Sequence, residues 1–230
     1  MTKLRKPLLI VGISALIIAL ILNFQFLPGV GRFKHQAHVP NAYVKQELLK
    51  ADAQFKQGHK KAAIAILQPV VKQYPDEALV NFMLGLYLLV EHVYDENGKA
   101  QHPELADEGL GYIKKAVELE PSNQGYLLTY STILGEVGRD QESVSILEKH
   151  FFNDQNNEIR ASPKYRYLVF DYASSLVRLG RRDQALAEYK KSLAVTNNDE
   201  RIAKAYATLL SSPSVPSDKS TVKNNNIKQP

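Results

Sequence analysis

The chain has 230 residues and no cysteine or tryptophan, which excludes disulfide frameworks, thiolate zinc sites, iron–sulfur clusters and cysteine nucleophiles. Its formal net charge is +5, but residues 35–210 hold 21 basic against 23 acidic side chains, so the basic excess lies at the two ends. Because a phosphate-binding surface needs basic residues clustered on the folded body, we expect no nucleic-acid partner.

The first predicted element is a transmembrane helix at residues 7–27, preceded by a short basic segment at residues 1–6. Residues 7–31 carry no charge, and 14 of the 20 residues in 8–27 are Leu, Ile, Val or Phe. Twenty helical residues extend for about 30 Å, the thickness of the hydrocarbon core of a bilayer. A cleaved signal peptide is the competing interpretation. It needs a shorter apolar run and a small-x-small cleavage site, and the sequence after Leu22 lacks that site.

The orientation of this helix follows from the basic residues beside it. Three basic residues precede the span, at positions 3, 5 and 6, and two follow it, at positions 32 and 34. This excess favours an amino end in the cytosol. We therefore expect a single-pass protein of the bacterial inner membrane with its carboxy-terminal domain in the periplasm, where the lack of thiols is compatible with an oxidising environment.

A linker and a series of internal repeats follow. Residues 28–43 contain two prolines and two glycines and are expected to form the linker. Beyond it, four segments align with starts 34, 46 and 42 residues apart, so that the second copy carries 12 extra residues and the third carries eight. The copies are residues 44–77, 78–123, 124–165 and 166–199.

Two columns of this alignment hold a small residue in every copy. They are Ala51, Gly85, Ser131 and Ala173 at the eighth position, and Ala63, Gly109, Ser143 and Ala185 at the twentieth. Between the two columns, Gly58, Gly138 and Gly180 separate two apolar-periodic runs. Two antiparallel helices pack closely where each presents a small residue, and glycine permits a tight turn between them. Each copy is therefore predicted to be a helix hairpin packed through these eight small residues.

A single hairpin cannot bury its second face, so the copies are expected to stack. Large residues at the twenty-fourth position and Pro75 and Pro121 near the thirty-second recur with the small residues and the glycine. With this pattern the chain resembles the tetratricopeptide repeat (TPR) family over residues 44–199. The resemblance implies an all-α solenoid of about four helix hairpins. Residues 200–210 are then a capping helix, and the Ser-, Pro-, Asn- and Lys-rich residues 211–230 are expected to be disordered.

In the TPR family the first helices of the hairpins line a concave groove that binds extended peptides or partner helices. The resemblance places ten residues there: Leu48, Asp52, Phe55, Leu79, Phe82, Leu86, Leu128, Tyr167, Phe170 and Val177. An apolar and aromatic lining of this kind suits a partner with hydrophobic side chains. The alternative is that several of these residues pack between neighbouring repeats, which is the commoner position of a hydrophobic residue.

No catalytic motif is recognisable, because the sequence contains no G-x-S-x-G, Walker A or G-x-G-x-x-G pattern. The insertion at residues 91–108 contains several acidic residues and two histidines, but their spacing matches neither a helical His-x-x-x-His pair nor a calcium loop. We therefore assign no catalytic, cofactor-binding or metal-binding residue and do not expect an enzyme. A metal-dependent or regulatory role of this insertion stays open as an alternative.

These observations together predict a membrane-tethered scaffold or adaptor. Its groove would bind another protein or a peptide segment, residues 7–27 would contact the lipid bilayer, and the protein would assist the assembly of a bacterial envelope complex. A second alternative is a receptor of the mitochondrial import type, whose repeats face the cytosol. The sequence does not identify the partner or the oligomeric state.

Overall fold

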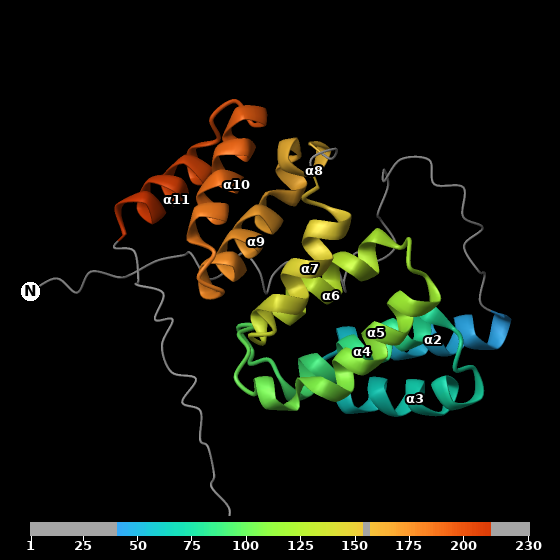
Figure 1. Ribbon diagram of the computed structural model, residues 1–230. Coiled ribbons are helices and arrows are strands. Elements are labelled where there is room, and N and C mark those ends of the chain that lie inside the picture. Colours follow the sequence, from blue (N-terminus) through green and yellow to red (C-terminus); the bar gives the residue numbers. More distant parts are fainter. Residues whose placement is uncertain (1–40, 154–156, 213–230) are drawn as a thin grey trace, which may run out of the picture.

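The computed structural model describes residues 41–153 and 157–212, which form helices and short connecting segments (Figure 1). The predicted transmembrane helix at residues 7–27 and the last 18 residues, 213–230, lie outside the described residues. In the part of the chain that is described, no helix is long and apolar enough to cross a membrane.

The described residues confirm the predicted all-α class and the arrangement of the hairpins. The helices pair in chain order and consecutive pairs pack against one another. The four pairs are α2 (Ala42–Lys56) with α3 (Lys60–Gln73), α4 (Ala78–His92) with α5 (Ala106–Leu119), α6 (Gln124–Glu136) with α7 (Asp140–His150), and α9 (Arg166–Arg178) with α10 (Arg182–Val195). A last helix, α11 (Glu200–Ser211), packs on α10.

Glycine makes three of the four turns inside the hairpins. Gly58, Gly138 and Gly180 have φ of +83°, +82° and +73°, a left-handed conformation that is strained for residues with a Cβ. The residue after each glycine then donates its backbone N–H to a carbonyl near the end of the preceding helix. This arrangement ends one helix and starts the return of the chain within three residues.

Small residues lie where the helices of a hairpin cross. A Cβ added to Gly85 would lie 2.6 Å from the carbonyl oxygen of Gly109, so α4 and α5 approach too closely for a larger residue. In the third hairpin, the Ser143 hydroxyl donates a 2.7 Å hydrogen bond to the Ser131 carbonyl. Ala51, Ala63, Ala173 and Ala185 are fully buried in the first and fourth hairpins.

Helix α6 separates two hydrophobic clusters. Tyr126, Tyr130, Ile133 and Leu134 belong to the cluster of the first two hairpins, whereas Leu127 and Leu128 belong to that of α7 to α11. All nine residues from Tyr126 to Leu134 are buried, so this helix has no solvent face over most of its length. Figure 1 shows α6 between the blue-green half, α2 to α5, and the orange-red half, α9 to α11.

The described residues of both insertions form local structure. Between α4 and α5 the chain forms an isolated bridge between Tyr94 and Ala100 and the 3-10 helix Pro103–Leu105. Between α7 and α9 it forms α8 (Glu158–Ala161), which packs against α10, and the 3-10 helix Pro163–Tyr165. The insertions therefore add contacts to the stack.

Candidate partner-binding surface

Three residues assigned to the groove lie in the hydrophobic core. Phe82, Leu86 and Leu128 are only 4%, 3% and 8% exposed. Phe82 stacks on the ring of Tyr126, with 4.4 Å between the ring centroids, so the next hairpin covers it. These three residues are therefore buried rather than open to solvent: Phe82 and Leu86 lie on α4, where Phe82 meets Tyr126 of α6, and Leu128 lies on α6 itself.

Six other residues of the predicted groove are half-buried: Leu48, Asp52, Phe55, Leu79, Tyr167 and Phe170. Phe55 stacks on Tyr87 of the next hairpin at a centroid distance of 4.2 Å. Asp52 forms a 2.7 Å ion pair with Lys56 one helical turn later. Val177, on α9, is 40% exposed. Among the ten residues of the predicted groove, Val177 is therefore the most exposed, and the six half-buried residues present only part of their side chains to solvent.

The insertion between α4 and α5 is part of the folded body. Val93 and Tyr94 are 1% and 9% exposed and belong to the hydrophobic cluster of the first two hairpins. The Asp95 carboxylate accepts hydrogen bonds from the backbone N–H groups of Asn97 and Lys99 and from the Gln101 amide. These bonds close the loop from within. No group of three or more His, Cys, Asp and Glu side chains within the described residues is arranged to hold a metal ion.

The insertion places Tyr94 against the end of α6. Its hydroxyl donates a 2.6 Å hydrogen bond to Oε2 of Glu136, the last residue of that helix. Burial raises the pKa of Glu136 to about 7, and the hydrogen bond from Tyr94 opposes this rise. Burial and the neighbouring Glu136 charge also raise the pKa of Tyr94 above its ordinary range. Glu136 is thus a carboxyl group held in a fixed position but poorly solvated.

A second acidic residue, Asp171 on α9, belongs to the same neighbourhood. Burial raises its pKa to about 7, the charge of Glu136 adds to this rise, and the charge of Arg178 opposes it. Its Oδ2 atom is buried and has no hydrogen-bond partner among the described residues. An oxygen of this kind loses its water without a compensating bond, which costs about 1–3 kcal/mol or more for a charged group. The carboxyl group of Asp171 is therefore incompletely satisfied.

Arg178 does not supply the missing partner, because it is committed to α7 and α6. Its Nε and Nη2 atoms donate to both oxygens of Asp140 at 2.6 to 3.0 Å, and Nη2 also contacts the Gly135 carbonyl and the Ser175 hydroxyl. This bidentate geometry is the strong form of an arginine–carboxylate pair. We use the name acidic seam for three residues: Tyr94 in the insertion after α4, Glu136 at the end of α6, and Asp171 on α9.

The paired helices, their glycine turns and the small residues at their crossings define the repeat. The fold is of the tetratricopeptide repeat type. No family model matches the sequence, and no curated protein matches it. Among solved structures, the chain is similar to a thermophilic TPR protein of Thermus thermophilus, with 20% identity and a TM-score of 0.47 over 71% of this chain and 79% of that chain.

The residues of the acidic seam were missed in the TPR alignment because they occupy other positions. Glu136 and Asp171 are the thirteenth and sixth residues of the third and fourth copies, whereas the groove was assigned from positions 2, 5, 9 and 12. Tyr94 lies in the insertion, which has no equivalent in the other copies. One signal was present in the sequence, since Asp171 is the only acidic residue in the aromatic helix α9.

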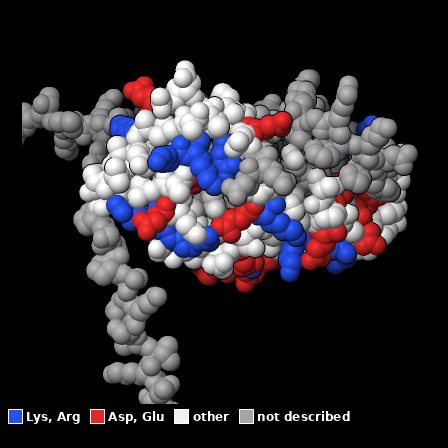
Figure 2. Space-filling view, turned by 45° about the horizontal axis from the view of Figure 1, so that its top comes forward, with Lys and Arg blue, Asp and Glu red and all other residues white. Residues whose placement is uncertain are grey.

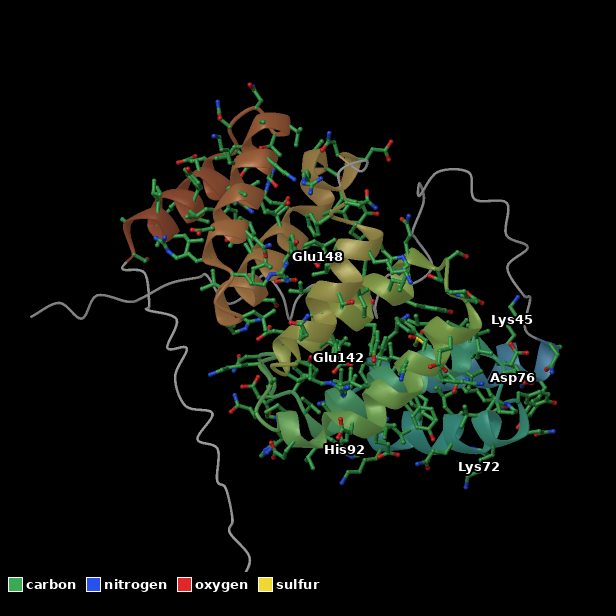
Figure 3. The ribbon with its side chains drawn as sticks, viewed as in Figure 1. Lys45, Lys72, Asp76, His92, Glu142 and Glu148 are labelled. Carbon is green, nitrogen blue, oxygen red and sulfur yellow. The ribbon has the colours of Figure 1, made fainter. Side chains whose placement is uncertain are left out.

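The outer surface carries mixed charge. On the face shown in Figure 2, acidic and basic side chains alternate along the lower edge. Figure 3 labels several such residues, including Glu142 and Glu148 on α7 and Lys45 on α2. Some of them join neighbouring hairpins: Arg139 pairs with both Glu142 and Asp107, and Arg181 pairs with Glu148. Exposed pairs of this kind add little stability, typically less than about 1 kcal/mol each.

Proposed function

We propose that the protein is a membrane-tethered TPR-type scaffold that binds a partner protein or peptide at the bacterial inner membrane. Its helical domain lies in the periplasm and contributes there to the assembly of an envelope complex. The observation that carries the proposal is the four-hairpin stack itself. Stacked hairpins present an extended surface along their first helices, and such surfaces suit elongated polypeptides.

The pairing of the buried charged side chains supports a binding role rather than a catalytic one. In the described residues, the buried charged groups Arg160, Glu188 and Asp140 form structural pairs between helices. A catalytic site needs several polar groups converging on a position where a substrate atom can sit. These three buried groups instead join helices of consecutive copies of the stack.

The membrane part of the proposal rests on the sequence. Residues 7–31 are uncharged, and three basic residues precede them. A periplasmic alkaline phosphatase fused after residue 230 should be active, whereas a green fluorescent protein at the same place should stay dark. The reverse result would favour the alternative of a cytosol-facing receptor. Recovery of the full chain in the salt-washed soluble fraction would contradict tethering altogether.

Partner binding is tested with a photo-crosslinking amino acid placed at Val177, which is exposed on α9. Lys190 is the matched control because it is exposed on the second helix of the same hairpin. Irradiation of cells expressing the full chain should give a discrete crosslinked product from position 177 and none from position 190. The same product, or no product, from both positions would contradict binding along the first helices.

A further inference from the structure

Charge is distributed unevenly along the stack. The first hairpin, residues 42–73, carries six Lys and two acidic residues, which gives it a net charge of +4. Residues 74–123, the second hairpin with its insertion, carry three Lys and ten acidic residues, which gives them a net charge of −7. An anionic surface should therefore attract the first hairpin and repel the second.

Helix α2 also has a face that the stack leaves uncovered. Six exposed residues at spacings of three and four form this outer face of α2: Ala42, Lys45, Gln46, Leu49, Ala53 and Lys56. Leu49 is 53% exposed, and Tyr43 beside the face is 44% exposed. Two of the five large hydrophobic side chains that are exposed in the described part of the chain thus belong to this one helix.

Every charged residue on the outer face of α2 is a lysine. The two acidic residues of the helix are half-buried, and Glu47 and Asp52 pair with Lys50 and Lys56 at 2.6 and 2.7 Å. Lys45 is therefore the lysine of this helix that has no ion pair with a described residue, and it lies at the outer edge of the stack (Figure 3). The face thus combines exposed apolar side chains with an available positive charge.

The place of α2 in the chain brings its outer face close to a bilayer. The helix begins at Ala42, and 14 residues, 28–41, separate it from the predicted span at residues 7–27. Fourteen residues reach at most about 50 Å even when fully extended. Such a short tether keeps α2 at a high effective concentration near the membrane surface. Helix α11, in contrast, lies at the far end of the stack (Figure 1).

We propose that the outer face of α2 docks on the bilayer surface, with Leu49 and Tyr43 among the lipid headgroups and Lys45 against anionic phosphate groups. The inference rests on the proposed membrane tethering and adds an orientation, in which the first hairpin lies on the membrane and the later hairpins project from it. Lysines beside exposed apolar side chains are typical of helices that lie in the membrane interface. A second copy fits this face less well, because a symmetric pairing would bring the lysines of both copies together.

Site-specific fluorescence tests the proposal on the full chain, which has no native cysteine. A polarity-sensitive dye is attached to Leu49→Cys on α2 or to the matched control Leu210→Cys on α11, where the native leucines are 53% and 55% exposed. A third variant, Ser14→Cys, reports insertion of the predicted span. Each protein is reconstituted in nanodiscs of phosphatidylcholine alone, or of an equal mixture with phosphatidylglycerol, that contain a lipid with a nitroxide quencher near its headgroup.

The dye at position 49 should be quenched in the mixed nanodiscs and several-fold less in the neutral ones, whereas the dye at position 210 should stay unquenched in both. Adding Lys45→Gln to Leu49→Cys should lower the docking equilibrium constant, obtained from the quenched fraction, by about fivefold, which is the contribution of one lysine near an anionic surface. Lys190→Gln is the matched control, because Lys190 is an exposed lysine of α10, and it should leave the constant unchanged.

The outcomes separate docking from tethering. Quenching at position 14 with no more quenching at position 49 than at position 210 overturns docking and leaves the tether intact. A dye at position 49 that is shielded from aqueous iodide but not quenched by the lipid shows that a protein covers the face, which also overturns docking. Equal quenching at position 49 in both lipid mixtures overturns the selection of anionic lipid. No lipid quenching at position 14 overturns tethering and this inference with it.

Discussion

In the amino-terminal half of the stack, α4 and α5 pack through two glycines, whereas the carboxy-terminal half joins its helices through arginine–carboxylate pairs. Gly85 and Gly109 leave no room for a side chain at the crossing of α4 and α5. In contrast, the buried pair Arg160–Glu188 connects α8 to α10, and Arg178–Asp140 connects α9 to α7. The first solution depends on shape and the second on matched charges, so the same kind of substitution should affect the two halves differently.

The largest effect is expected from Arg160→Ala. This change leaves Glu188, 6% exposed, as an uncompensated buried charge and frees the Phe152 carbonyl that Arg160 also binds. Breaking a buried pair in this way costs about 3–5 kcal/mol of unfolding free energy. Urea unfolding followed by circular dichroism measures the loss.

Arg139→Ala is the control, because Arg139 also binds two carboxylates but is 37% exposed. Its loss should stay below about 1 kcal/mol. Equal losses for the two arginines would contradict the idea that buried charge pairing holds the carboxy-terminal half. The double variant Arg160→Met, Glu188→Leu should recover part of the stability, because it removes both charges together.

A smaller effect is expected at the crossing of α4 and α5. An Ala at Gly109 would place its Cβ 2.6 Å from Leu89 Cγ and 2.8 Å from the Gly85 carbonyl oxygen. Overpacking of this kind costs about 1–3 kcal/mol. Gly111→Ala, on the same helix, meets nothing within 4 Å and should instead stabilise the protein by about 0.4–1 kcal/mol. Thermal unfolding measures both variants. If Gly109→Ala and Gly111→Ala shifted the melting temperature in the same direction, the close crossing would be contradicted.

The acidic seam should make the stability depend on pH. The pKa values of Glu136 and Asp171 are each about 7 in the folded protein, above the values of about 4 in an unfolded chain. The folded state therefore binds more protons between about pH 4 and 7, and stability falls as the pH rises through that window. Besides burial, the hydrogen bond from Tyr94 lowers the pKa of Glu136. The charge of Glu136 raises the pKa of Asp171, and the charge of Arg178 lowers it.

Asp171→Asn removes one of these titrations. At about pH 8 it should stabilise the unliganded protein by about 1–3 kcal/mol, and the gain should vanish below about pH 4, where the wild-type carboxyl group is protonated in both states. Denaturant unfolding across this range measures the difference. A constant difference at all pH values would show that Asp171 does not titrate within the fold.

The smallest effect is expected at the last helix. Arg182 donates to the carbonyls of Leu209, Leu210 and Ser212 and thereby satisfies the end of α11. Arg182→Ala should weaken α11 by about 1 kcal/mol, visible as faster amide hydrogen exchange in that helix alone. Arg201→Ala, at an exposed position of α11, should leave the exchange unchanged. Faster exchange throughout the carboxy-terminal half would mean that α11 is not a separate capping element.

The hairpins were predictable because they depend on local signals. A small residue at each crossing and a glycine at the turn recur with the spacing of the repeat, and the structure has helices beginning at Ala78, Gln124 and Arg166, the starts of three aligned copies. The first helix begins two residues before the aligned start, at Ala42, where the Asn41 side chain accepts a hydrogen bond from Val44 and caps it.

The surface was less predictable because it depends on how consecutive hairpins rotate against each other. Phe82 was placed in the groove from its position in the repeat, but the rotation brings Tyr126 over it. In the acidic seam, Tyr94 bonds to Glu136, which lies 42 positions later in the sequence. No periodic pattern encodes such a contact. Charge pairs between distant residues follow from the packing and cannot be inferred before it is known.

The position of α6 has a consequence for how the molecule melts. Helix α6 contributes buried side chains to both hydrophobic clusters. Neither cluster can therefore unfold without exposing apolar side chains of the other. Repeat arrays can come apart one unit at a time when their interfaces are weak. Here the shared wall couples the two halves, and the stack should unfold in a single cooperative transition.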